Sequence, residues 1–253
     1  MTQLHDGFWN FRGDFRIAGV VNVGTHLSLA RRPDGRFLVL DSYELDGEDR
    51  ARLMSLTDNG AAIDAIVNVH PFHTLHCAAM HALLPGVALI GTARHRRQAP
   101  DLPWAAGVIE DAGTQAGFAD TLDFSIPPGV DFVCPDDKVH VASVVVRHRA
   151  SGIVHVDDTM NVLAPPSLLK AVLPEPRLRF HPMLARALQA RRGAADEYAA
   201  WARDLADRWA DTRIVCAAHS AVRRLEPGGW RAEMLGALDH VRPALDRHRR
   251  VHA

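Results

Sequence analysis

The sequence lacks the features that mark several large classes of protein. None of its apolar runs approaches the roughly 20 residues that a membrane-spanning helix needs. Residues 1–14 contain no basic start followed by an apolar run, so we expect no secretory signal. The three cysteines, Cys77, Cys134 and Cys216, are odd in number and far apart, which favours reduced thiols over a disulfide framework. We therefore expect a cytoplasmic protein with no membrane partner.

The sequence also lacks an excess of charge and two common catalytic motifs. Lys and Arg number 29 and Asp and Glu 30, which leaves a net charge of −1. A protein that binds along a phosphate backbone usually carries a basic excess, so we expect no nucleic-acid partner. No Gly-x-Ser-x-Gly elbow and no Gly-x-Gly-x-x-Gly or Gly-Lys-Ser/Thr loop occurs. The sequence therefore excludes a hydrolase with a serine nucleophile elbow and a nucleotide-binding protein with either of these glycine-rich loops.

The first half of the chain alternates strand-like and helix-like patterns. Strands are expected at residues 16–30, 37–41, 62–69 and 87–91, with helices at 44–56 and 73–84. The run at 62–69 is short and β-branched, which is typical of a central, buried strand. This alternation predicts a layered α/β sheet.

The second half is again rich in strands and then becomes helical. A strand pair is expected at 139–147 and 152–156, and a further strand at 214–217. Residues 165–211 have a helical pattern, and a last amphipathic helix starts at about Trp230. No Ser/Gly linker and no internal repeat separates the halves. We therefore expect one domain over residues 1–253, with two mixed sheets packed face to face and helices outside.

The chain contains 15 histidines, and one group of them follows the expected buried strand directly. This group is His70-Pro71-Phe72-His73-Thr74-Leu75-His76. The carboxyl end of a strand is where α/β proteins usually place their sites, and imidazoles that converge there can bind a transition metal. The alternative is that His73 and His76 are polar residues hydrogen-bonded at the start of a helix.

This run resembles the His-x-His-x-Asp-His signature of the metallo-β-lactamase superfamily. The similarity extends over almost the entire chain. The hairpin ending in Asp41 is similar to the first hairpin of that family, and His140 is similar to its Gly-His segment. Val156-Asp157-Asp158-Thr159 resembles its Gly-Asp-Thr segment, and Ala217-Ala218-His219 resembles the segment with its final histidine. The resemblance implies a four-layer αβ/βα sandwich.

The resemblance also implies a set of metal ligands, which is incomplete. The family ligands fall on His73, His76, His140, Asp158 and His219. Pro71 and Leu75 stand where a histidine and an aspartate belong, so each of the two family metal sites loses one ligand. The surviving sets are His73, His140 and Asp158, and His76, Asp158 and His219. Either set is sufficient for one Zn, Fe or Mn ion with water in the open positions.

Two functions follow from this resemblance. The first is a metal-dependent hydrolase for a small-molecule substrate, in which Asp158 holds the metal and the metal-bound water becomes hydroxide. Its activity is expected to be slow or mononuclear, because Leu75 cannot orient the water as the family aspartate does. The second is a non-catalytic relative that binds a small ligand or a partner protein in the former active-site cleft.

Several of these residues also have ordinary structural interpretations. Asp158 could cap a turn, and His219 could be a core histidine with a backbone partner. His73, Cys77 and His81 are four apart, so they would share one face of the expected helix, either as ligands or packed on the sheet. The basic run Arg94–Arg97 could contact an acidic group or phosphate of a substrate, or form a solvated loop.

Overall fold

The computed structural model describes residues 1–14, 16–17, 21–22, 24–162, 177–218 and 222–253. The chain divides into two compact units. The first comprises Met1–Phe124 and Val146–Ser151, and the second comprises Ser125–Val145 and Gly152–Ala253. That the whole chain folds as one domain stays a prediction. None of the described helices is both long and apolar enough to cross a membrane.

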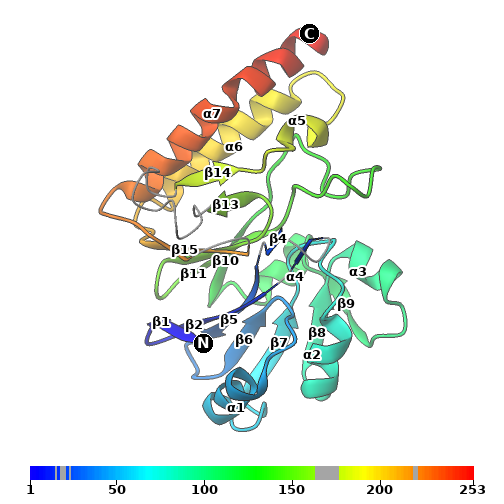
Figure 1. Ribbon diagram of the computed structural model, residues 1–253, viewed down its shortest axis with the longest axis vertical. Coiled ribbons are helices and arrows are strands. Elements are labelled where there is room, and N and C mark those ends of the chain that lie inside the picture. The colour runs from blue at the N-terminus through cyan, green and yellow to red at the C-terminus, as the bar shows by residue number, and fades with distance from the viewer. Residues whose placement is uncertain (15, 18–20, 23, 163–176, 219–221) are drawn as a thin grey trace. The chain divides into compact units, whose positions relative to one another are not determined.

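The first unit is built on a seven-stranded mixed sheet (Figure 1). Its order is β1 (Thr2–His5), β2 (Phe8–Gly13), β5 (Thr25–Arg31), β6 (Phe37–Leu40), β7 (Ile63–Val67), β8 (Ala88–Gly91) and β9 (Trp104–Val108). Neighbours are antiparallel from β1 to β6 and parallel from β6 to β9. The buried β7 lies inside this sheet between β6 and β8, which confirms its expected central position. The short strands β3 (Arg16–Ile17) and β4 (Val21–Asn22) pair with each other.

Helices of the first unit lie beside this sheet (Figure 1). They are α1 (Gly47–Leu56), α2 (Cys77–Leu83), α3 (Ala93–Gln98) and α4 (Ala112–Ala116). Helix α1 begins after Asp46, whose side chain accepts a hydrogen bond from the Asp49 N–H at 2.8 Å and so caps the helix. Leu53 of α1 and Met80 of α2 are buried in one apolar core with Ile66 of β7. This burial fixes α1 and α2 on the sheet.

The second sheet is also mixed. Its five strands have the order β10 (Leu122–Ser125), β11 (Val145–His148), β12 (Ile153–Val156), β15 (Ile214–Ala217) and β16 (Val222–Arg224). Strands β12 and β15 are parallel, and β15 and β16 are antiparallel. A further antiparallel pair is formed by β13 (Met160–Val162) and β14 (Leu178–Phe180). Two mixed sheets with flanking helices confirm the expected α/β class.

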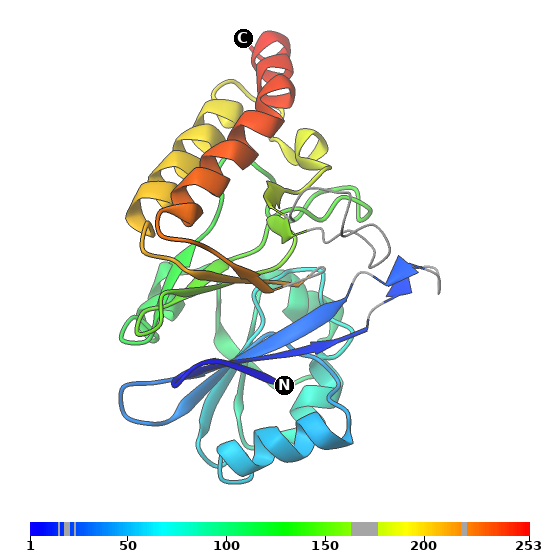
Figure 2. The same cartoon turned by 60° about the vertical axis from the view of Figure 1, so that its left-hand side comes forward.

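The helices of the second unit are α5 (Leu184–Ala187), α6 (Ala194–Arg208) and α7 (Gly229–Val251), and α6 and α7 lie side by side (Figures 1 and 2). They run antiparallel. The Trp230 indole N–H at the start of α7 donates to the Leu205 carbonyl near the end of α6, at 3.1 Å. At the other end, Arg249 Nε lies 2.8 Å from a carboxylate oxygen of Asp196.

Several elements differ from the sequence-based expectations. The N-terminal residues form the hairpin β1–β2, because Phe8, Trp9 and Phe11 are buried in the core. Helix α2 begins at Cys77 rather than at residue 73, and the strand expected at 139–147 is β11, which begins at Val145. The helical region 165–211 contains β14, because residues 178–180 lie between Pro176 and Pro182 and are too few for a helix. Residues 163–176 of that region lie outside the described residues.

Gly129 provides a test of packing in the second unit. Its φ is +74°, and a Cβ at this position would lie 2.0 Å from the carbonyl oxygen of Ala194. We expect Gly129→Ala to lower the free energy of unfolding by about 1–2 kcal/mol for the left-handed backbone and by roughly 1–3 kcal/mol more for the clash. The matched control is Gly228→Ala in the same unit, where φ is +77° but nothing lies within 4 Å of the added Cβ. Urea denaturation would measure both, and equal losses would contradict the clash.

Candidate functional site

Residues 70–76, which we call the histidine loop, follow β7 as a series of tight turns. The N–H of His73 donates to the His70 carbonyl at 3.1 Å, and the N–H of Cys77 donates to the Thr74 carbonyl at 3.3 Å. The Phe72 N–H lies 3.2 Å from His70 Nδ1, so that nitrogen is turned into its own loop. The rings of His70 and His73 are stacked, with centroids 4.1 Å apart. A ring nitrogen of each lies within 4.8 Å of the other, which is close enough to share one metal ion.

The histidine loop differs from the signature alignment that the sequence suggested. Leu75, expected to replace an aspartate inside the pocket, has a side chain that is 70% exposed, so that expectation is wrong. His70, rather than a residue at position 71, is the histidine that stacks on His73. The turns at Phe72 and Thr74 change which side chains face inward. Spacing in the sequence alone does not contain this information.

His76 is half-buried at the start of α2. Its ring meets the ring of Tyr43 edge-on, with centroids 5.5 Å apart. Burial lowers the pKa of His76, and the nearby Glu44 carboxylate opposes that shift. The neutral imidazole that results is the form that binds a metal.

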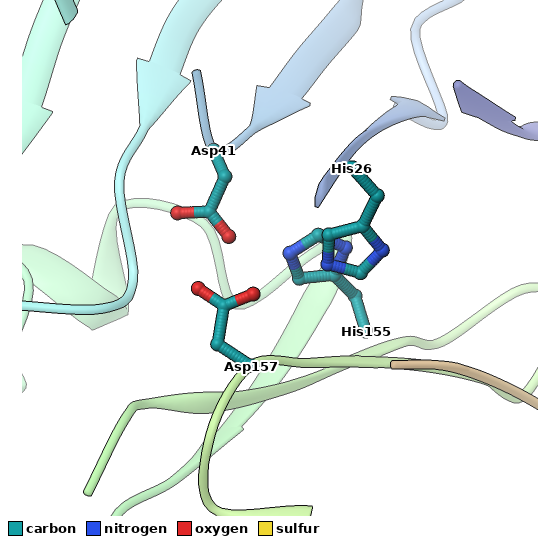
Figure 3. A group of neighbouring side chains, drawn as sticks. All are labelled: His26, Asp41, His155 and Asp157. Atoms are coloured by element: carbon teal, nitrogen blue, oxygen red, sulfur yellow. The ribbon is translucent and has the colours of Figure 1, made fainter. Parts of the chain in front are cut away.

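A second pair of candidate ligands lies in the first unit, on β5 and after β6 (Figure 3). His26 and Asp41 are both buried, and a ring nitrogen and a carboxylate oxygen of the two lie within 4.8 Å of each other. The Val69 N–H donates to Asp41 Oδ1 at 2.8 Å, and the Asn10 amide lies 3.3 Å from His26 Nδ1. Sequence reasoning noted Asp41 only as the end of a hairpin and missed His26. The available signal was the pair His26 and Ser28, which share one face of a strand whose other central residues are apolar.

In the second unit, His140 and Asp158 form the most direct contact among the expected ligands. Nδ1 of His140 lies 2.9 Å from Oδ2 of Asp158. The Asp158 side chain is 2% exposed, whereas that of His140 is 40% exposed. Histidine ligands of metal ions commonly donate one ring N–H to a carboxylate in this way and bind the ion with the other nitrogen.

Local hydrogen bonds explain how two residues 18 positions apart come together. Thr159, next to Asp158, accepts the Ser143 N–H at its Oγ1 at 2.8 Å, and the two hydroxyl oxygens lie 2.9 Å apart. Met160 N–H donates to the Asp157 carbonyl at 3.2 Å and closes the turn after β12. These bonds fix the turn that carries Asp158 against the segment that carries His140.

A further pair in the second unit was not predicted as ligands. His155 on β12 and Asp157 just after it are both buried, with a ligand atom of each within 4.8 Å of the other (Figure 3). Alternate residues of an extended segment share one face, so their spacing of two places both side chains on the same side. His155 interrupts an otherwise apolar strand, and that interruption was the signal in the sequence. His219, the last expected ligand, lies outside the described residues.

The helix face proposed for His73, Cys77 and His81 does not form, because His73 precedes α2. The thiol of Cys77 contacts Oδ1 of Asn68 at 3.5 Å and the His73 carbonyl at 3.6 Å. Burial raises the pKa of the Cys77 thiol to about 12. Without a metal ion beside it, the Cys77 thiol is therefore protonated at neutral pH.

The buried histidine and aspartate groups could hold a metal ion. Imidazole nitrogen and carboxylate oxygen together suit zinc, iron and manganese. Burying an ionised carboxylate is costly unless a positive charge or hydrogen bonds compensate it, and a divalent cation would supply that charge. The chemistry of these residues therefore fits a divalent transition metal, although each pair alone supplies fewer than the three protein ligands of a catalytic site.

Comparison of structures found solved proteins with the same fold, whereas comparison of sequences found no match. No protein-family model matches the chain, and no curated protein matches it by sequence. A metallo-β-lactamase from Erythrobacter litoralis, with β-mercaptoethanol in its active site, is similar with a TM-score of 0.60 and 18% identity, over 94% of this chain and 95% of that one.

Two other metallo-β-lactamases are similar to the same extent. The enzyme from Pontibacter korlensis has a TM-score of 0.57 and 13% identity, over 97% of both chains. FIM-1 from Pseudomonas aeruginosa, in its mono-zinc form, has a TM-score of 0.54 and 14% identity, over 99% of this chain and 92% of that one. At these identities the likeness establishes the fold alone.

The state of Cys77 can be tested directly. We expect Cys77 in the folded protein to resist iodoacetamide at pH 8, because the thiol is buried and its pKa is about 12. Peptide mass spectrometry after alkylation would measure this, and the same protein in urea provides the control in which Cys77 reacts. Rapid alkylation of Cys77 in the native protein would contradict a buried, protonated thiol.

Proposed function

Because the chain has the metallo-β-lactamase fold, we propose that it is a metal-dependent hydrolase that binds one divalent transition metal. The observation that carries this proposal is the His140–Asp158 pair, a nearly buried carboxylate 2.9 Å from a histidine nitrogen. Solved proteins with the same fold are named as metallo-β-lactamases, and one of them, FIM-1, is described in a mono-zinc form. That form supports a single ion, which we take to be zinc, iron or manganese.

The proposed ligands are those that the family resemblance implies. His73, His140 and Asp158 form the primary set, and the stacking of His70 on His73 makes His70 a fourth candidate. The set His76, Asp158 and His219, implied by the family resemblance, is retained as the alternative.

The proposed residues have distinct tasks in hydrolysis. A divalent metal bound by them would lower the pKa of a coordinated water toward neutrality and so make hydroxide available at pH 7. Asp158 orients the His140 ring through the contact between its Oδ2 and Nδ1 of His140, at 2.9 Å. The hydrogen bonds between Thr159 and Ser143 keep Asp158 in place. Residues 70–76 contain no carboxylate to orient an attacking water, so we expect slow hydrolysis of a small-molecule substrate.

Metal analysis and hydrolysis assays test the proposal. We expect about one zinc per chain after dialysis against zinc and then buffer, and slow hydrolysis of a generic ester or lactam. His140→Ala and Asp158→Asn should each weaken zinc binding by about 10–100-fold, because each removes a ligand or its hydrogen-bond partner. The control is His240→Ala, an exposed histidine on α7.

Three other outcomes of these measurements would each contradict part of the proposal. Two zinc ions per chain would contradict the single-metal site. Absence of both zinc and hydrolysis would overturn the proposed activity and favour the non-catalytic binding protein. If His240→Ala loses as much zinc as His140→Ala, then His140 is not a zinc ligand.

The exposure of Leu75 leads to a separate expectation. If Leu75 stood in a metal pocket, Leu75→Asp together with Pro71→His would raise the zinc stoichiometry toward two. Because the Leu75 side chain is 70% exposed, we expect Leu75→Asp alone to leave the stoichiometry and the affinity unchanged within about twofold. Isothermal titration with zinc would measure both, and a second bound zinc in Leu75→Asp would show that residue 75 does face a metal.

A further inference from the structure

The basic run Arg94–Arg97 does not form a loop. Its first two residues, Arg94 and His95, do not form an exposed site for an anion. It forms most of helix α3, which begins directly after β8. Arg94 and His95 contact the histidine loop, whereas Arg97 is exposed and Arg96 donates to the Ala106 carbonyl at 2.7 Å. The run therefore divides into two residues that contact the loop and two that do not.

The imidazole of His95 is held by hydrogen bonds on both ring nitrogens. Nδ1 accepts the Thr92 N–H at 3.1 Å, and Oγ1 of Thr92 lies 2.9 Å away. Because Nδ1 is an acceptor, the ring proton lies on Nε2, which donates to the His73 carbonyl at 3.3 Å. The side chain is fully buried. These hydrogen bonds therefore hold the ring in one orientation and one tautomer.

The structure around His95 leaves little room for another orientation. Gly91 precedes the helix cap, and a Cβ at this position would lie 2.8 Å from Cβ of His95 and 2.7 Å from the Trp104 ring. The indole of Trp104 packs against the imidazole, with ring centroids 5.4 Å apart. The contact between His95 and the His73 carbonyl is thus preorganised by the end of β8.

Arg94 contacts the two loop residues that lie between His70 and His73. Its Nη1 donates to the Pro71 carbonyl at 3.2 Å. Its guanidinium carbon lies 4.0 Å from the centroid of the Phe72 ring, a cation–π distance. Together with His95, helix α3 therefore contacts three consecutive residues of the loop.

We propose that His95 and Arg94 are positioning residues that fix the backbone of the histidine loop so that the imidazoles of His70 and His73 are preorganised for a metal ion. This inference rests on the proposed function, because it assigns these residues to the same metal site. Groups that orient metal ligands through hydrogen bonds typically change metal affinity by about 10–100-fold when they are removed. Neither residue is itself a ligand here, since Nδ1 and Nε2 of His95 are both engaged and a guanidinium does not bind cations.

Cobalt titration of the metal-free, full-length chain tests this inference. The visible absorption of bound Co²⁺ depends on the geometry of its ligands, so it reports on positioning and not only on folding. We expect His95→Phe and Arg94→Ala to weaken Co²⁺ binding about tenfold or more and to change the absorption bands, because the loop backbone is released. His95→Gln retains an N–H donor for the His73 carbonyl and should recover part of the affinity. Arg97→Ala, an exposed position on the same short helix, should bind Co²⁺ as the wild type does.

The outcomes separate this inference from the proposed function. Wild-type affinity and an unchanged spectrum in folded His95→Phe and Arg94→Ala would overturn the positioning role while leaving the metal site intact. No Co²⁺ binding by the wild-type chain would overturn the proposed function, and the positioning role with it. If His95→Phe does not fold, as judged by circular dichroism, Arg94→Ala and His95→Gln still decide the question.

Discussion

The parallel alignment of β6, β7 and β8 determines which side chains meet in the first unit. Leu40 pairs with Val67, and Val67 with Ile90, so the three strands end at one edge of the sheet. Asp41 follows β6, the histidine loop follows β7, and α3 follows β8. Hydrogen bonds extend this alignment past the strands: Asp41 N–H donates to the Val67 carbonyl at 2.9 Å, and Asn68 N–H donates to that of Ile90 at 2.9 Å. The contacts of the loop with α3, and the contact of Val69 just before the loop with Asp41, all depend on this common edge.

The second unit repeats this arrangement with different residues. Strand β12 runs parallel to β15, and Asp157 and Asp158 follow β12 directly. His219 follows β15 in the sequence. In both units, then, carboxylates with metal-binding chemistry, Asp41, Asp157 and Asp158, come directly after strands that pair in parallel, where a chain leaving the sheet can expose both backbone and side-chain groups.

The sequence predicted strands β5, β6, β7 and β8 of the first half, because short β-branched runs separated by helical patterns leave few alternatives. It also implied, although only through a family resemblance, that His140 and Asp158 lie near each other, and the two side chains are in contact. It did not predict which way the residues of the histidine loop point, because a turn at Phe72 has no periodicity from which a face could be read. His26 and His155 were missed for a related reason: a single buried histidine in an apolar strand resembles an ordinary core residue.

The burial of three aspartates is difficult to explain by stability alone. Asp41, Asp157 and Asp158 are at most 3% exposed, and removing an ionised carboxylate from water costs several kcal/mol even where hydrogen bonds offset part of it. Well-packed apolar residues of similar volume are often neutral or stabilising in place of such groups. Hydrogen bonds from Val69 to Asp41 and from His140 to Asp158 orient two of these carboxylates. Buried carboxylates beside imidazoles could hold a cation, and this is the physical reason to test metal binding before any substrate.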